Sequence, residues 1–171
     1  MAAEQQQGSP TASSDLSGPI SLQTDPRAVL DSLQRRVLNH WLGKHRQYAI
    51  IKRDFCSCAD LYYSPGQTPY VAVGDFNQDG HNDFAILLEQ TVRLGLSDEH
   101  DGPSILLVFN GPFSRSAKEP AFGATGWQVR DVAAVESDGH TLFVGTSESD
   151  NGYSFSAIGN SYELHYAGDG G

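Results

Sequence analysis

The stretch from Asp75 to Asp83 reads Asp-Phe-Asn-Gln-Asp-Gly-His-Asn-Asp and places oxygen-bearing side chains at odd offsets around one glycine. Calcium takes six to eight oxygen ligands at about 2.3 to 2.6 Å, so a short loop must direct several carboxylates, amides and carbonyls to one point. The ligands predicted from this spacing are Asp75, Asn77, Asp79, the backbone carbonyl of His81, and Asp83. The side chain of His81 is not expected to take part, because nitrogen ligands suit calcium poorly.

Gly80 stands at position six of this loop, where glycine allows a sharp turn because it reaches positive φ without a Cβ penalty. The carboxylates of Asp75, Asp79 and Asp83 repel one another. At roughly 5 Å separation and an effective dielectric of 20, each pair costs about 3 kcal/mol, which a bound cation would offset. The alternative interpretation is an ordinary Asp/Asn/Gly turn between two strands, since these residues also dominate turns.

The elements around the loop read as strands. An EF-hand has helices on both sides and a bidentate Glu at position twelve, where this chain has Ile86. Short apolar runs precede and follow the loop, from Tyr70 to Val73 and from Phe84 to Leu88. The sequence therefore predicts a strand, a metal loop and a second strand.

The segment from Val73 to Ala85 resembles the calcium-loop signature of the FG-GAP and VCBS repeat families, Asp-x-Asn-x-Asp-Gly-x-x-Asp. The similarity covers residues about 68–89 in a single copy. It implies Ca²⁺ as the cofactor, side-chain ligands from Asp75, Asn77, Asp79 and Asp83, a backbone ligand from His81, and usually an extracellular setting. The propellers built from these repeats need four to eight blades, and this chain has one loop. Only the metal hairpin is therefore carried over, and the propeller fold is not.

The composition is that of one acidic domain. The 171 residues include 21 acidic and 11 basic side chains, for a formal net charge of −10. This balance argues against nucleic acid or an anionic membrane as the main partner. No run approaches the roughly 20 apolar residues of a membrane span. The start of the chain does not read as an intact signal peptide, although an export signal could have been removed.

The two cysteines, Cys56 and Cys58, are too close in sequence to staple loops together. A Cys-x-Cys metal or redox site has no second pair to complete it, so buried free thiols are the better interpretation. Their redox state is left open.

Residues 1–23 are rich in Gln, Ser, Gly, Pro and Ala and are predicted to form a disordered leader or linker, followed by a single domain over residues 24–171. A helix is expected to begin at Asp25, with Pro26 at its first position, and to end at or shortly after Gly43. Apolar residues recur at three- and four-residue steps along it, at Val29, Leu30, Leu33, Val37, Leu38, Trp41 and Leu42.

Short β runs follow the helix. The predicted strands are 48–52, 59–63, 69–74, 83–89, 104–109, 127–135, 141–146, 153–158 and 162–166, with a Gly/Pro/Ser-rich loop over 111–126. One helix before many sequential strands predicts an α+β domain, in which an amphipathic helix packs on a mainly antiparallel sheet that is curved or partly closed. A β-sandwich with a peripheral helix is the alternative.

Catalytic motifs are weak. Gly145 to Ser149 lacks the second glycine of a nucleophile elbow, and the six histidines form no zinc-hydrolase motif. Whether the chain is an enzyme is left uncertain, with a non-enzymatic role favoured. Aromatics at Tyr62, Tyr63, Tyr70, Trp127 and Tyr153 could face a protein or glycan, or pack in the core.

The favoured function is a calcium-stabilised, extracytoplasmic (periplasmic or secreted) interaction module that binds a protein or glycan. One alternative is a small hydrolase or lyase in which calcium organises an acidic cleft, with Asp75 or Asp83 beside Glu136, Glu148 or a histidine. The other is an acidic inhibitor or immunity-type interaction protein in the cytoplasm, whose loop is only a turn. The ligand and the oligomeric state are left open.

Overall fold

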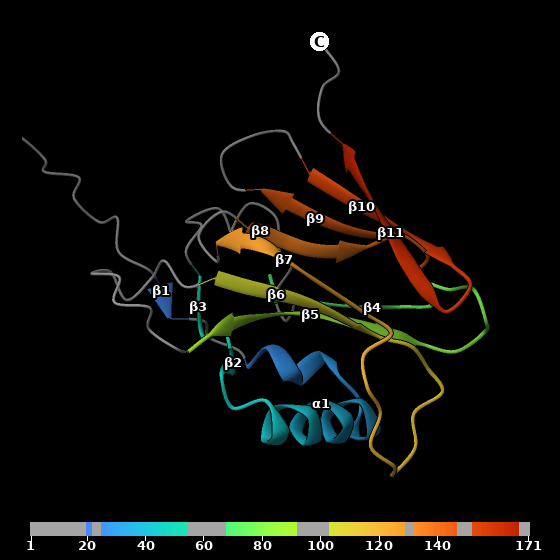
Figure 1. The fold of residues 1–171 in the computed structure, drawn as a ribbon, viewed down its shortest axis with the longest axis horizontal. Helices are drawn as coiled ribbons and strands as arrows, with labels where there is room; N and C mark the ends of the chain where they lie inside the picture. Colours follow the sequence, from blue (N-terminus) through green and yellow to red (C-terminus); the bar gives the residue numbers. More distant parts are fainter. Residues whose placement is uncertain are drawn as a thin grey trace, which may run out of the picture.

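The computed structural model describes residues 20–21, 25–54, 68–91, 103–128, 132–146 and 152–167. One N-terminal α-helix packs with two open antiparallel sheets, one of five strands and one of four (Figure 1). The predicted α+β class, with a helix on an antiparallel sheet, is confirmed. Because the two sheets lie face to face, the arrangement is also sandwich-like.

The strands are β1 (Ile20–Ser21), β2 (Tyr48–Ile50), β3 (Arg53–Asp54), β4 (Val71–Gly74), β5 (Asp83–Gln90), β6 (Pro103–Phe109), β7 (Phe122–Gln128), β8 (Val132–Ser137), β9 (Leu142–Thr146), β10 (Gly152–Ile158) and β11 (Ser161–Ala167). The five-stranded sheet has the order β2-β5-β6-β7, with β4 also paired to β5. The four-stranded sheet has the order β11-β10-β9-β8. β1 and β3 form a separate two-residue pair, so Ile20 and Ser21 are paired within the segment assigned to a leader.

The single predicted helix is divided in two. A 3-10 helix, η1 (Pro26–Val29), is capped by Asp25 as expected, and Leu30 then adopts an extended conformation. The α-helix α1 (Ser32–Lys44) begins with a second cap, in which the Asp31 carboxylate accepts from the backbone of Leu33 and Gln34. Gln34 completes a capping box by accepting from the Asp31 amide at 2.9 Å. Asp31 therefore starts a new helix rather than continuing the first one.

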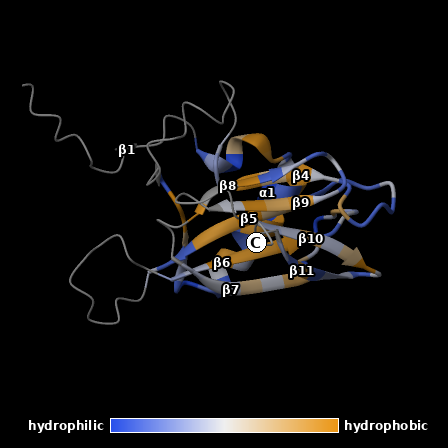
Figure 2. Ribbon diagram, turned by 90° about the horizontal axis from the view of Figure 1, so that it is seen from above, coloured by the Kyte–Doolittle hydropathy of each residue, from blue (hydrophilic) through white to orange (hydrophobic). Residues whose placement is uncertain are grey.

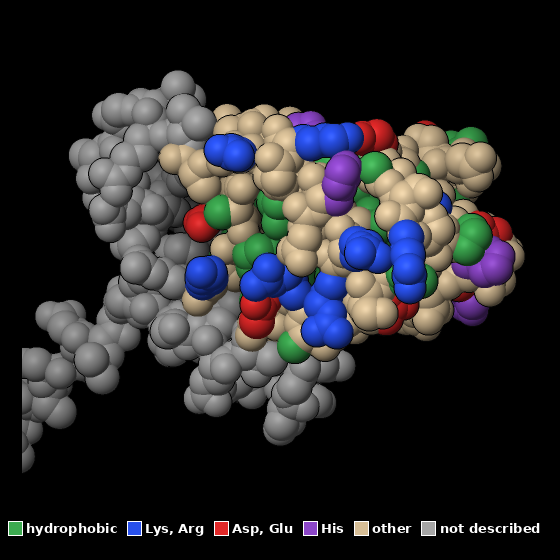
Figure 3. All heavy atoms as spheres, turned by 90° about the horizontal axis from the view of Figure 1, so that it is seen from below, with side chains coloured by type: hydrophobic (Ala, Val, Ile, Leu, Met, Phe, Trp, Pro, Cys, Tyr) green, Lys and Arg blue, Asp and Glu red, His purple; other side chains and the backbone are tan. Residues whose placement is uncertain are grey.

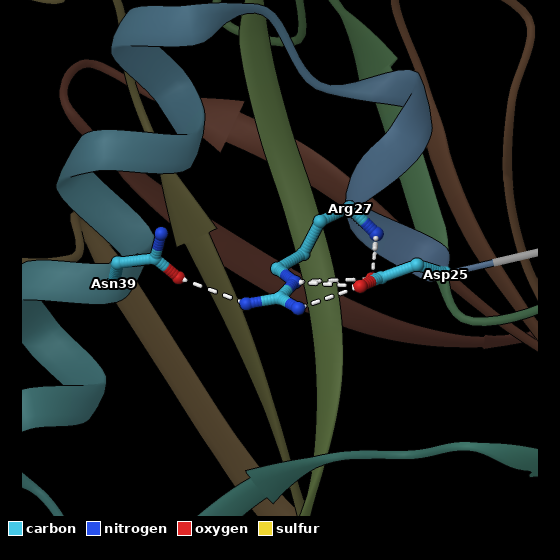
Figure 4. A network of polar contacts seen from close by, with 3 residues as sticks. All are labelled: Asp25, Arg27 and Asn39. Atoms are coloured by element: carbon cyan, nitrogen blue, oxygen red, sulfur yellow. Dashed lines mark hydrogen bonds and ion pairs between the residues drawn. The ribbon is translucent and has the colours of Figure 1, made fainter.

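A side-chain contact joins the two helical pieces (Figure 4). The guanidinium of Arg27 donates to the Asp25 carboxylate, at 2.6 Å for the shortest contact, and to Oδ1 of Asn39 at 3.2 Å. The neighbouring Arg27 guanidinium lowers the pKa of Asp25. Arg27 thus fixes the position of η1 against α1.

β5 is the central strand, and it is buried on both faces. Phe84, Ile86 and Leu88 pack with α1, while Ala85 and Leu87 face the four-stranded sheet. Figure 2 shows the hydrophobic residues running along β5 and β6. The continuous apolar run read from the sequence is therefore the signature of a strand between two layers.

One predicted loop is in part a strand. The segment 111–126 contains the first half of β7, which pairs with β6 through partners such as Leu107 and Gly123. The predicted strand 127–135 is correspondingly divided between β7 and β8. Gly123 lies within the sheet, and a Cβ at this position would come 3.3 Å from the Leu107 side chain. The small residue marks close packing rather than a turn.

The two sheets are joined along one side by backbone hydrogen bonds. The Val135 amide donates to the Pro69 carbonyl at 2.7 Å, and the Asp75 amide donates to the Gly139 carbonyl at 2.9 Å. The predicted strand 59–63 and both cysteines, Cys56 and Cys58, lie outside the described residues. Within the described part of the chain, no helix is long and apolar enough to cross a bilayer.

Candidate metal-binding loop

The segment from Asp75 to Asn82 connects β4 to β5 in a hairpin. β4 and β5 are antiparallel partners, and the last pair before the loop is Gly74 with Asp83. The predicted strand, loop and strand unit is confirmed. Position twelve, Ile86, is a buried residue of β5, so the loop has no EF-hand helix on this side.

Three of the predicted ligands lie on the same side of the loop. The Asp79 amide donates to Oδ1 of Asp75 at 3.0 Å and to Oδ1 of Asn77 at 3.2 Å. The second oxygen of Asp75 accepts from the Gly80 amide at 2.9 Å. Asn77 in turn donates its side-chain amide to the Asp79 carboxylate at 3.0 Å. The oxygens of positions one and three therefore meet at the amide of position five.

The turn is made by two residues in the left-handed region. Gly80 has a φ of +85°, which confirms the expected sharp turn, and Gln78 has a φ of +57°. The His81 amide donates to the Asp79 carboxylate at 2.9 Å, and the His81 side chain is exposed. Side-chain oxygens of the loop accept from the amides of residues 79, 80 and 81, so the loop's own polar side chains stabilise the turn.

Asp83 differs from the other predicted ligands because it is buried. Its side chain has no exposed surface. One oxygen accepts from the amides of Phe76 at 2.9 Å and Asn77 at 3.2 Å, and the other accepts from the Gly111 amide at 2.7 Å. Burial raises the pKa of Asp83, while these three amides oppose that shift by stabilising the carboxylate. Asp83 is therefore buried beneath the loop, and the nearby charge of Asp79 adds to the rise of its pKa.

Two residues that sequence reasoning missed complete the surroundings of Asp83. The Tyr162 hydroxyl, from β11, lies 3.4 Å from the Asp83 carboxylate and donates to Oδ1 of Asn110 at 2.7 Å. Asn110 is also buried, directly after β6. Burial and the nearby Asp83 charge raise the pKa of Tyr162, and the charges of Asp79 and Asp75 add to the effect. The hairpin loop, β6 and β11 therefore meet at one buried polar cluster.

The β8–β9 turn contacts the other side of the loop. Besides the bond from the Asp75 amide to Gly139, a ring nitrogen of His140 lies 3.4 Å from the Asp75 carbonyl. β4 and the β8–β9 turn come close together at Gly74, where a Cβ would lie 2.9 Å from the Gly139 carbonyl. Gly139 itself has a φ of +101°. The β8–β9 turn therefore packs against the loop at Gly139.

The fit of a calcium ion to these residues is partial in the arrangement that the structure shows. Asp75, Asn77 and Asp79 supply oxygen donors on one exposed side, which is the chemistry that calcium prefers. Across the described residues, no three His, Cys, Asp or Glu side chains gather into a metal-binding group. Within this loop, Asp83 is buried, and its two oxygens accept the amides of Phe76, Asn77 and Gly111.

Other candidate groups are placed elsewhere. Tyr70 and Trp127 are buried in the core between the sheets, so neither forms an exposed aromatic face. Tyr153 is partly buried against Trp127, with ring centroids 5.6 Å apart. Glu136, a candidate partner of Asp83 in an acidic cleft, is exposed on β8. The contacts of Asp83 are instead with the amides of Phe76 and Gly111 and the hydroxyl of Tyr162. Tyr62, Tyr63 and Glu148 lie outside the described residues.

In the described part of the chain, the helix α1 and two packed sheets form the fold, and the acidic β4–β5 loop contacts both sheets. Comparisons with protein-family models, curated proteins and solved structures find no match for this chain. The likeness of residues 73–85 to a calcium loop therefore rests on the motif and on the geometry of the hairpin.

Proposed function

We propose that the hairpin loop binds calcium and that the ion stabilises a non-enzymatic, extracytoplasmic domain whose work is to bind a partner. The observation that carries the calcium proposal is the convergence of Asp75 and Asn77 oxygens at the Asp79 amide. These are positions one, three and five of the loop, and the turn between them is already formed. The ion would be held by Asp75, Asn77, Asp79 and the His81 carbonyl, and it would supply positive charge to an acidic loop.

We assign Asp83 the part of an anchor within this proposal. Its carboxylate holds the loop to the interior through Phe76, Asn77 and Gly111. The motif implies that Asp83 is also a ligand, and a carboxylate has about four lone-pair sites, of which three accept these amides. Because a buried amide left unpaired costs about 1 to 3 kcal/mol, the anchor role of Asp83 does not depend on the ion.

The contacts of the acidic side chains in the loop support a non-enzymatic role. The carboxylates of Asp75 and Asp79 accept backbone amides of their own loop. His140 contacts a backbone carbonyl of the loop rather than a carboxylate. Among the described residues, no hydrogen bond joins the Asp75 or Asp79 carboxylate to a second titratable side chain that could act with it as acid or base. This supports the binding domain over the hydrolase or lyase.

Isothermal titration of the chelator-treated protein with CaCl₂ tests the proposal. One binding event with a dissociation constant of about 0.1 to 1 mM is expected, as for extracellular calcium modules. Asp79→Asn should weaken it by roughly tenfold, since it removes one charged ligand. The matched control is Asp138→Asn, an exposed acid that also accepts two backbone amides in the neighbouring turn.

Equal affinity in the Asp79 variant and the wild type would contradict the ligand assignment. No calcium binding up to about 10 mM would leave the loop as a simple turn and refute the calcium proposal. Magnesium provides a selectivity control, because it demands near-octahedral geometry and gives up water reluctantly.

A further inference from the structure

The exposed side of α1 is basic, although the chain as a whole carries a net charge of −10. Between Ser32 and Lys44 the helix contains no acidic residue. Arg36, His40 and Lys44 follow one another at four-residue steps, so they lie along one line of the helix surface. Figure 3 shows Lys and Arg side chains spread over this face of the molecule.

The basic surface continues beyond the helix. Arg46 follows the last turn, and Arg115 lies in the segment between β6 and β7. That segment adjoins the end of α1, since Lys44 and Glu119 form an ion pair at 3.6 Å. We call the basic face the set of exposed side chains Arg35, Arg36, Lys44, Arg46 and Arg115.

Local carboxylates leave most of this charge uncompensated. Asp31 caps the first turn of α1, Asp25 is paired with Arg27, and Glu119 forms an ion pair with Lys44. Among the described residues, no carboxylate lies within ion-pair distance of Arg35, Arg36, Arg46 or Arg115. Lys118 lies nearby but donates to the carbonyls of Gly111 and Pro112, so it holds its own segment.

We propose that the basic face is a docking surface for an acidic segment of a partner protein. This deepens the binding role proposed above, and it rests on that role but not on calcium. At physiological salt the screening length is about 8 Å, so a partner in contact with this face senses the local cations more than the distant acids. The charge of the whole chain therefore does not describe the charge that such a partner meets.

The composition of the face favours a protein over a lipid surface. Four of its five cations are Arg, a residue enriched at protein interfaces and suited to paired hydrogen bonds with carboxylates. Stable attachment to a bilayer also draws on inserted apolar side chains. Val37, Leu38 and Trp41 of α1 are buried against the sheet, so the helix does not offer these apolar side chains for insertion.

The experiment is fluorescence anisotropy with a labelled poly-glutamate peptide of about 20 residues, at about 20 mM and about 150 mM salt, with EDTA present. The wild type should bind, and more weakly at the higher salt. Arg35→Gln with Arg36→Gln should weaken binding by roughly tenfold, with the helix intact by circular dichroism, because Gln is also a good helix former. Arg46→Gln with Arg115→Gln makes the same test outside the helix.

The matched control is Ser154→Glu with Ser161→Glu, which changes the net charge equally but lies in the sheet on the far side from α1 (Figure 1). Its binding should stay within about twofold of the wild type. Equal weakening in control and test variants, or no binding at low salt, would overturn the proposal. So would tighter binding to phosphatidylglycerol vesicles than to the peptide. Since calcium is chelated throughout, these outcomes are independent of the metal titration.

Discussion

Asp83 and Tyr162 are 79 positions apart in the chain, yet the Tyr162 hydroxyl lies 3.4 Å from the Asp83 carboxylate in the interior. Asp83 is the first residue of β5, at the end of the acidic loop, and Tyr162 belongs to β11 in the other sheet. Asn110 completes the cluster by accepting from the same hydroxyl at 2.7 Å. The conformation of the loop is therefore coupled to the packing of the two sheets.

Asp83→Ala should destabilise the protein by about 3 to 5 kcal/mol, because it leaves the buried amides of Phe76 and Gly111 and the partly buried amide of Asn77 without their acceptor. Urea unfolding in EDTA measures the free energy of unfolding. Asp138→Ala is the control, since Asp138 accepts two amides at an exposed turn where water can replace it. A loss below about 1 kcal/mol for Asp83→Ala would contradict the anchor role.

Tyr162→Phe should cost about 1 to 2 kcal/mol, because the buried Asn110 oxygen loses its donor while the ring still fills its place in the core. A double-mutant cycle with Asn110→Ala checks the cause. If the hydrogen bond carries the effect, the two losses should add to clearly more than the loss in the double variant. Additive losses would mean that the two side chains act separately.

Gly74→Ala should cost about 1 to 3 kcal/mol, because its Cβ would lie 2.8 Å from the Phe76 ring and 2.9 Å from the Gly139 carbonyl. Gly43→Ala provides a control of opposite sign. Gly43 lies in α1 with open space around a new Cβ, so the change should stabilise the protein by about 0.5 to 1 kcal/mol. Thermal melting compares the two variants with the wild type. An unchanged melting point for Gly74→Ala would show that the β8–β9 turn moves aside without cost, and it would contradict this prediction.

Asp25→Asn should remove a small pH-dependent part of the stability. The Arg27 guanidinium lowers the pKa of Asp25 in the folded protein below its usual value of 3.8. A lowered pKa contributes stability that is present above the unfolded pKa and is lost as the pH falls through the folded one. Because the Asp25 side chain is about half exposed, a few tenths of a kcal/mol are expected. The melting-point difference between wild type and variant at pH 7 should therefore shrink by pH 3, and a difference that grew would contradict this sign.

The fold class could be read from the sequence because its main signals are local. The spacing of Val37, Leu38 and Trp41 predicts a helix with one buried side, and the apolar run of β5 predicts a buried strand. The division of the helix at Leu30 was missed because Asp25 and Asp31 both make good caps, and the sequence does not say that both are used. The first half of β7 was missed because Gly123 and Gly126 suggested a loop, while pairing with β6 outweighs that propensity.

The spacing of the acidic residues identified the loop, but it did not predict which side chains are exposed and which is buried. Asp75, Asn77 and Asp79 share one pattern with Asp83, yet three of these side chains stay at the exposed loop and the fourth is buried. The difference arises from Gly111 and Tyr162, which reach Asp83 only through the tertiary fold. The one signal in the sequence was Asn110-Gly111 directly after an apolar strand, and on its own it indicates only a turn.

The melting temperature in about 5 mM CaCl₂ compared with EDTA tests the central claim most directly. With a dissociation constant of about 0.1 to 1 mM, calcium should add about 1 to 2 kcal/mol of stability, or roughly 3 to 8 °C. Asp79→Asn should lose most of this shift and Asp138→Asn should keep it. A wild-type melting temperature that is the same in calcium and in chelator would contradict the account, and the acidic loop would then be a turn held by its own backbone amides.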